Sequence, residues 1–254
     1  MDKLLQVNTQ SYAQRPDLIE ECELFLDKLW PQFMSQSSVC DEYWNRLDEE
    51  PNSYFQFIAT VNENEEERVI GIIRSVPFLW PYGDFSKLAE MGWDAIFNFA
   101  MENQQGGEPY ISALSVTVDP QYRGCQIPAL LINALKHAAK EYAAKAVIVP
   151  VRPTLKHCYP LQDFEAYCGW QNERGEPFDP WIRTHWRLGA TVLQPVHRSM
   201  VITGSIADWQ SWTGMYFPQS GQYIVPNALV PVTVDIQRQQ VEYIEPNLWM
   251  LHSL

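Results

Sequence analysis

The stretch Leu114-Ser-Val-Thr-Val-Asp-Pro-Gln-Tyr-Arg-Gly124 decides the predicted fold, because it joins a buried strand to an amphipathic helix through one glycine. Residues 112–118 are β-branched and apolar on both faces, which indicates a strand in the middle of a sheet. From about Gln126 to Tyr142, apolar residues recur every three or four positions, which predicts a helix with one buried face. The sequence therefore predicts a strand–turn–helix unit from Leu114 to Tyr142.

The turn in this unit has the properties of an anion site. Gly124 allows a tight turn and a close approach of the backbone to a ligand. The first amides of the next helix lack partners within the helix, and the positive end of the helix dipole lies there. Arg123 adds a full charge, and Pro128 falls in the first turn, where its missing N–H matters least. A turn of this kind that binds nothing is the alternative interpretation.

These residues resemble the acyl-CoA motif of the GNAT superfamily of N-acetyltransferases, which is written Q/R-x-x-G-x-G/A. Gln121 and Gly124 match the motif, whereas Gln126 stands where the family has Gly or Ala. The resemblance implies acetyl-CoA or another acyl-CoA as co-substrate, and no metal. It assigns cofactor binding to the motif strand and the turn, namely to Val116, Val118, Arg123, Gly124, Cys125, Gln126 and Ile127.

The elements around the motif follow the family's order. Periodicity and turn signals predict, in sequence, a strand at Leu4–Asn8, helices from Asp17 and at Cys40–Leu47, a hairpin of strands at 54–61 and 69–76, a helix around Met91–Met101, a buried strand at Ala146–Val151, a helix from Asp179-Pro180 to Gly189, and a final antiparallel pair, Thr191–Val196 with Ser199–Gly204.

The predicted fold class is α+β, with a mixed, mostly antiparallel central sheet flanked by helices. The sequence shows no clear linker, so we expect a single enlarged domain over residues 1–254. Its core covers about 1–204, with an irregular insertion at 154–178. Residues 205–254 form a C-terminal extension with a short strand near Val230–Ile236.

Two residues are candidates for the chemistry. Acyl transfer to an amine needs a group that takes the amine proton and an acid that protonates the departing thiolate. Many GNAT enzymes place a tyrosine as that acid four residues before the glycine that ends the helix after the fifth strand. His185 holds this position before Gly189, and its side chain titrates at about 6.5 when unperturbed. A core histidine with one hydrogen bond is the alternative for His185.

Tyr159, seven residues beyond Arg152, is the second candidate for the acid, with a packed loop tyrosine as its alternative. Ser115 lies on the motif strand between apolar neighbours, and we expect its hydroxyl to be bonded internally. Glu108 and Asp119 flank the same strand at solvent-like ends, so the sequence indicates no general base. A water relay or an unidentified side chain is expected in that role.

The composition indicates which binding partners and which cellular compartment are expected. The formal charge of −13 argues against nonspecific binding to nucleic acid or to an anionic membrane. Five cysteines without a CxxC pair predict reduced thiols and no zinc site. The first residues lack the pattern of a signal peptide, so we expect a cytoplasmic protein. The aromatic-rich residues 205–254 are expected to be mostly core, with an acceptor pocket or a homodimer contact as alternatives.

The sequence thus predicts an enzyme that moves an acetyl or other acyl group from acyl-CoA to a small-molecule or carrier-bound amine. Three alternatives stay open on the same fold. They are an acyl-CoA decarboxylase, a thiol acyltransferase and a non-catalytic module that binds a ligand.

Overall fold

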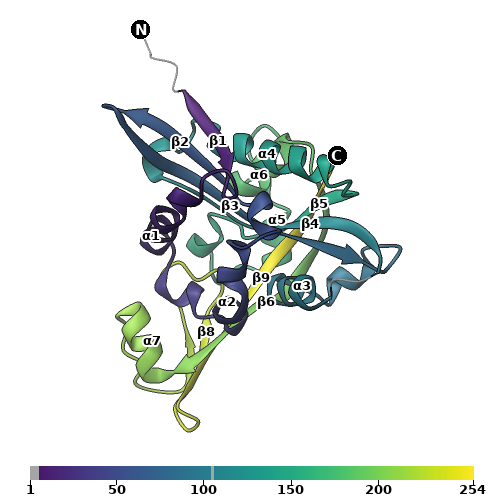
Figure 1. The fold of residues 1–254 in the computed structure, drawn as a ribbon. Helices are drawn as coiled ribbons and strands as arrows, with labels where there is room; N and C mark the ends of the chain where they lie inside the picture. Colours follow the sequence, from purple (N-terminus) through teal and green to yellow (C-terminus); the bar gives the residue numbers. More distant parts are fainter. Residues whose placement is uncertain (1–5, 104–105) are drawn as a thin grey trace.

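In the computed structural model, which describes residues 6–103 and 106–254, a nine-stranded sheet carries helices on both faces (Figure 1). The strands are β1 Val7–Ser11, β2 Phe57–Glu63, β3 Glu66–Trp80, β4 Glu108–Val118, β5 Ala146–Val151, β6 Thr191–Ser205, β7 Gly221–Tyr223, β8 Val232–Asp235 and β9 Gln240–Ser253. Their order is β1-β2-β3-β4-β5-β9-β8-β7, and β6 also pairs with β9. Only the β4–β5 pair is parallel among these described strands. The α+β class and the mostly antiparallel sheet are confirmed.

The helices divide between the two faces of the sheet because their apolar stripes join different cores. They are α1 Ile19–Leu29, α2 Ser38–Tyr43, α3 Trp93–Glu102, α4 Ile127–Glu141, α5 Phe164–Cys168, α6 Pro180–Arg187 and α7 Ile206–Thr213. Residues of α4 and α6 pack with one face of β2–β5, as Leu131 and Ile182 show. On the other face, α1 packs on β2 and β3, whereas α2 and α3 join the core that includes β6 and β9.

The strand–turn–helix unit is confirmed. The predicted buried strand is β4, and the predicted helix is α4, which begins at Ile127 with Pro128 in its first turn. The predicted strand at Ala146–Val151 is β5, and all six of its residues are buried. Asp179 caps α6, and Gly189 follows that helix with a φ of 84°. The first predicted strand is found as β1, while residues 4 and 5 lie outside the described part of the chain.

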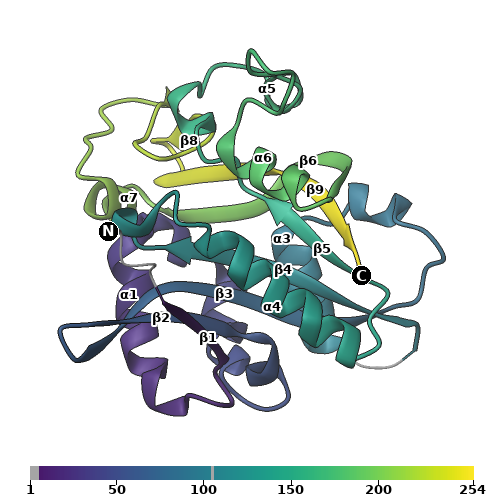
Figure 2. The same cartoon turned by 90° about the horizontal axis from the view of Figure 1, so that it is seen from above.

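The predicted final hairpin is wrong. Residues 191–205 form one long strand, β6, and its partner is β9. Two register shifts in the β6–β9 pairing, between Val192 and Gln194 and between Val196 and Met200, mark irregularities that the sequence suggested to be a turn. Strand β9 also pairs with β5, from Ala146↔Ser253 to Val151↔Leu248, so it lies between β5 and β6 (Figure 2). Residues 240–253 are therefore part of the central sheet.

No helix within the described residues is long and apolar enough to cross a membrane.

Candidate active site

A gap between β4 and β5 lies at the centre of the sheet. The two parallel strands pair only at Ile111↔Val147 and Ser112↔Ile148. Strand β4 then contains a bulge, since Arg74 of β3 opposes Ser115 and Ser75 opposes Ala113, which leaves Leu114 as an extra residue. A bulge bends a strand and ends its regular pairing. Beyond these two pairs, β4 and β5 therefore splay apart.

A cavity of about 740 Å³ opens beside this gap, on the face that carries α1, α2 and α3. That volume is within the range of small-molecule sites. Leu114 and Ser115 of β4 and Pro150 of β5 contribute to its wall at the gap. Its apolar and aromatic side chains include Leu26, Trp30, Met34, Trp44, Trp93 and Met200, and its charged side chains are Glu23, Asp27, Asp41, Arg152 and Glu245.

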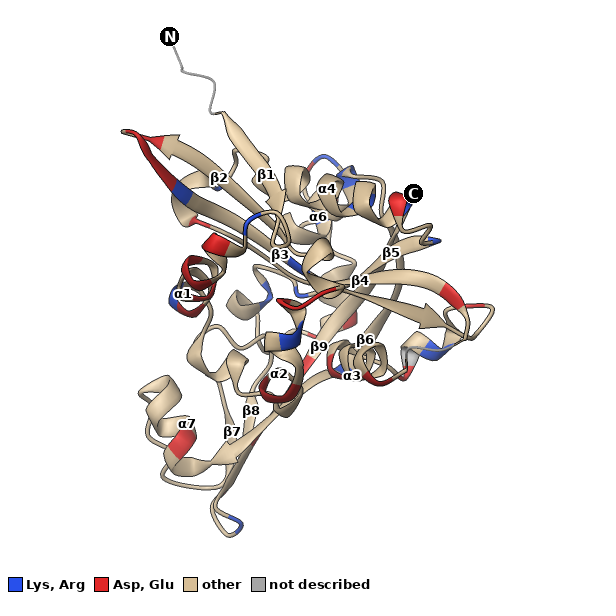
Figure 3. Ribbon diagram, viewed as in Figure 1, with Lys and Arg blue, Asp and Glu red and all other residues tan. Residues whose placement is uncertain are grey.

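The charged side chains of the cavity wall are predominantly acidic. Glu23 and Asp27 come from α1, Asp41 from α2 and Glu245 from β9, against a single cation, Arg152. Figure 3 shows acidic residues over α1 and α2, the helices beside the cavity. Asp27 and Asp41 are exposed, and neither carboxylate makes a hydrogen bond or ion pair with a residue that the structure describes. A cavity of this charge attracts cationic ligands.

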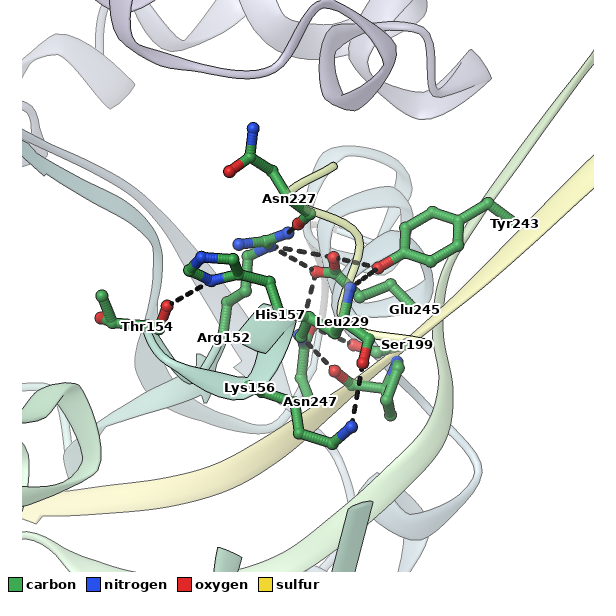
Figure 4. Close-up of polar contacts among 11 residues, drawn as sticks. Arg152, Thr154, Lys156, His157, Ser199, Asn227, Leu229, Tyr243, Glu245 and Asn247 are labelled. Atoms are coloured by element: carbon green, nitrogen blue, oxygen red, sulfur yellow. Dashed lines mark hydrogen bonds and ion pairs between the residues drawn. The ribbon is translucent and has the colours of Figure 1, made fainter. Parts of the chain in front are cut away.

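Arg152 and Glu245 form a buried ion pair on the cavity wall. The Arg152 Nε donates to both carboxylate oxygens of Glu245, at 3.1 and 2.9 Å, and Nη2 donates to the Asn227 carbonyl at 2.6 Å. Glu245 is fully buried and also accepts from the Tyr243 hydroxyl at 2.8 Å and from Asn247 Nδ2 at 3.3 Å (Figure 4). This network fixes the end of β5 against β9 and orients the Arg152 guanidinium.

A second arginine lies behind the α1 side of the cavity. Arg74 of β3 is fully buried and forms ion pairs with Asp48 at 2.8 Å and with Glu23 at 3.2 Å. Its guanidinium also stacks over the rings of Tyr12 and Trp44, at 4.8 and 4.9 Å from their centroids. Burial of a charge is tolerated when it is paired in this way. The cluster of one cation and two carboxylates leaves an excess negative charge beside the cavity.

The turn before α4 has the backbone expected of an anion site. Gly124 has a φ of 86°, and Gln126 caps the helix in the left-handed region at φ 60° without a side-chain hydrogen bond. Arg123, Cys125 and Gln126 are exposed, and Ile127 is buried. Val116 and Val118 lie on the splayed part of β4, half-buried on the α4 side of the sheet. The residues predicted to bind the cofactor thus lie on the β4–α4 connection, and their role stays a prediction.

Gln126→Gly is expected to stabilise the protein by about 0.5–1 kcal/mol. A side chain in the left-handed region costs about 1–2 kcal/mol, and the greater freedom of glycine in the unfolded chain offsets part of the gain. Urea denaturation of the two proteins measures the difference. A less stable variant would mean that the Gln126 side chain makes a stabilising contact of its own.

His185 is in the core and does not line the cavity. Its side chain is fully buried, and its Nδ1 lies 2.9 Å from Nε2 of His252, which is also fully buried. Burial, followed by the charge of His252, lowers the pKa of His185 well below its ordinary value. A neutral, enclosed imidazole does not present a proton to a ligand in the cavity. The structure therefore places His185 as the core histidine of the alternative interpretation, and the catalytic role predicted for it gains no support.

Tyr159 is in the insertion and does not line the cavity either. Its ring contacts those of Tyr167, Trp170 and Phe178, with centroids 5.2 to 6.0 Å apart. Its carbonyl accepts from the buried Lys156 Nζ at 2.8 Å. This position matches the packed loop tyrosine that was the alternative.

Ser115 differs from expectation. Its hydroxyl is buried, lines the cavity and has no hydrogen-bond partner among the described residues, so the predicted internal bond is wrong. The acidic wall was also missed. Glu23 and Asp27 are four residues apart, and this spacing indicates that they share one helix face. Nothing in the sequence, however, places that face beside β4. Within residues 6–103 and 106–254, no group of three or more His, Cys, Asp or Glu could hold a metal ion.

Comparison with known proteins identifies the class. The sequence matches no model of a known protein family. It is 33% identical over 273 residues to the arginine N-acetyltransferase avaD of Aspergillus versicolor, covering 96% of this chain and 93% of the relative. The fold is similar to the loading GNATL domain of CurA from Lyngbya majuscula, at 17% identity and a TM-score of 0.58, with 98% of each chain covered. It is also similar to the GphF GNAT-like decarboxylase in complex with isobutyryl-CoA, at 14% identity and a TM-score of 0.57, with 98% of each chain covered.

The chain therefore belongs to the GNAT N-acetyltransferases. It is an acyl-CoA-dependent acyltransferase, as the motif strand and helix predicted.

Proposed function

We propose that the chain transfers an acetyl group from acetyl-CoA to the α-amino group of free arginine or of a closely similar cationic amino acid. The observation that carries the proposal is the acidic cavity beside the β4–β5 gap, with Arg152 on its wall. The relative avaD, an arginine N-acetyltransferase, supports the substrate class.

In this proposal the cofactor crosses the sheet through the gap. The backbone of Val116 and Val118 binds the pantetheine arm, and the turn from Arg123 to Ile127 holds the pyrophosphate at the N-terminus of α4. The thioester then lies at the bulge, next to Ser115 and the cavity. The amine and the acyl group therefore approach each other from opposite faces of the sheet.

The acceptor's charges match the cavity. A guanidinium forms paired hydrogen bonds with carboxylates, and Asp27 and Asp41 offer two without another partner in the described chain. Arg152 offers the complementary group for the substrate carboxylate. The guanidinium stays protonated at any physiological pH and is not a nucleophile, so the α-amine is the group that is acetylated.

The test compares free arginine with citrulline, whose side chain has nearly the same shape without the charge. We expect kcat/KM to be at least tenfold higher for arginine, since a lost charged hydrogen bond costs about 1.5–3 kcal/mol. The Asp27→Asn/Asp41→Asn double variant should reduce this preference by raising KM for arginine alone. Equal rates with both acceptors, or a preference that the double variant retains, would contradict the assignment.

The remaining proposals concern organisation and location. One sheet contains all the described strands, from the first to the last in the chain, which supports a single domain over residues 1–254. All five cysteines are free thiols, which supports a cytoplasmic location.

A further inference from the structure

The acceptor arrives as an ammonium ion, and a group in the cavity must take its proton before it can attack. The cluster around Arg74 offers a carboxylate for this. Arg74 is held by Asp48 at 2.8 Å, and Glu23 approaches the same nitrogen, Nη1, only at 3.2 Å. One guanidinium thus faces two carboxylates, and Glu23 is the more loosely held of the pair.

Only one of these carboxylates reaches the cavity. Glu23 lines it, with 33% of its side chain exposed, whereas Asp48 lies behind Arg74 outside the lining. The Trp44 indole donates to Glu23 Oε2 at 3.2 Å and fixes the carboxylate in place. Glu23 therefore presents an oriented acceptor of hydrogen bonds to whatever occupies the cavity.

The position of Glu23 relative to the gap follows from the sheet register. Arg74 opposes Ser115 across the β3–β4 pair, and opposed residues point to the same face of a sheet. Helix α1 is tied to the same part of β4, because the Trp30 indole, just after the helix, donates to the Thr117 hydroxyl at 2.8 Å. Glu23 and the Ser115 hydroxyl, which has no hydrogen-bond partner in the described part of the chain, thus line the cavity where the thioester must lie.

The other carboxylates of the cavity are less suitable. Both oxygens of Glu245 already accept from Arg152, and further donors are Tyr243 and Asn247. Asp27 and Asp41 are exposed on the outer helices, with no buried charge to orient them.

We propose that Glu23 takes the proton of the acceptor ammonium and so generates the nucleophilic amine. One N–H bond of the ammonium breaks, and the proton moves to a carboxylate oxygen of Glu23. The free amine then attacks the thioester carbon, the C–N bond forms and the C–S bond breaks. The thiolate of CoA takes a second proton from the same nitrogen, and Glu23 returns its proton to solvent. The Ser115 hydroxyl holds the amine by a hydrogen bond in this step.

The charges around Glu23 are consistent with this role. Burial raises the pKa of its carboxyl above the ordinary value, the charge of Arg74 opposes this, and Asp48 and Asp27 add to it. The groups that face it are Arg74 from β3, Asp48 just after the short helical turn Trp44–Leu47, Asp27 of α1 and the Trp44 indole. Asp41, Arg152 and Glu245 lie elsewhere on the cavity wall. A carboxylate with a raised pKa is a stronger base toward an ammonium.

The experiment compares Glu23→Gln with wild type. The amide oxygen keeps the bond from Trp44, and Asp48 still pairs with Arg74, so the fold and the affinity for acetyl-CoA are expected to persist. We expect kcat/KM at neutral pH to fall about 100-fold, a usual contribution of a general base. The loss should shrink at high pH and with arginine methyl ester, whose α-ammonium is more acidic. Glu20→Gln, on the same helix but exposed and outside the cavity, should match wild type.

The outcomes separate this inference from the substrate class on which it rests. The kcat/KM of wild type and of Glu23→Gln is compared with the primary amine of a panel that reacts fastest. A wild-type enzyme that does not acetylate arginine therefore contradicts the proposed substrate class alone. A kcat/KM of Glu23→Gln within threefold of the wild-type value overturns the role of Glu23. An equal loss with arginine and its methyl ester at every pH also overturns it, because that result indicates a structural contribution.

Discussion

Glu245→Ala is expected to lose about 3–5 kcal/mol of stability and nearly all activity. The substitution leaves Arg152 without its carboxylate partner, and removing one member of a buried ion pair costs about this much. It also leaves the hydroxyl of Tyr243 without an acceptor, whereas the Asn247 amide keeps the Pro246 carbonyl at 2.8 Å. The guanidinium that we assign to the substrate carboxylate then loses its orientation. Chemical denaturation and steady-state rates measure the two effects.

The matched control for Glu245→Ala is Glu242→Ala, three residues earlier on β9. Glu242 pairs with Arg198 at 3.8 Å on the surface, where an ion pair is worth at most about 1 kcal/mol. Similar losses for both variants would contradict the account of the buried pair.

Asp179→Ala is expected to destabilise the protein by about 4 kcal/mol. This buried carboxylate accepts from the amides of Thr154 and Leu155 after β5 and from the hydroxyl of Tyr167, at 2.8 to 3.1 Å. It also caps α6 by accepting from the next helix amides, at 2.9 and 3.3 Å. Loss of a helix cap costs about 1 kcal/mol, and each buried donor left unsatisfied adds about 1–3 kcal/mol.

Asp163→Ala is the control, because Asp163 caps α5 on the surface through one bond, from the Ala166 amide at 2.8 Å. We expect a loss of about 1 kcal/mol for this variant. Equal unfolding free energies for the two variants would show that the tie between β5, the insertion and α6 is not needed for stability.

The fold was predictable where local patterns determine it. The apolar run at Ala146–Val151 is a strand buried on both faces, and the Asp179-Pro180 pair starts a helix through side-chain and backbone effects within four residues. The pairing of β6 was not predictable in this way. Its partner β9 starts 35 residues after β6 ends, and no local signal distinguishes an irregular strand near Pro195 from the turn of a hairpin.

The site was predictable only in part for a related reason. Gly124 and the amides of α4 belong to one continuous motif, whereas the cavity is assembled from α1, α2, β4, β5 and β9. His185 fits the sequence position of the family's acid, but its neighbour His252 comes from β9, a strand that the sequence analysis did not foresee. Glu23 could be recognised only once the register of Arg74 with Ser115 was known.

Identifying the product formed from acetyl-CoA and free arginine tests which nitrogen of the acceptor is acetylated. We expect mass spectrometry and NMR to show one acetyl group, on the α-nitrogen, with release of one CoA for each product molecule. Acetyl on the guanidinium, or CoA release without an acetylated product, would contradict the proposal that the acidic cavity presents the α-amine to the thioester.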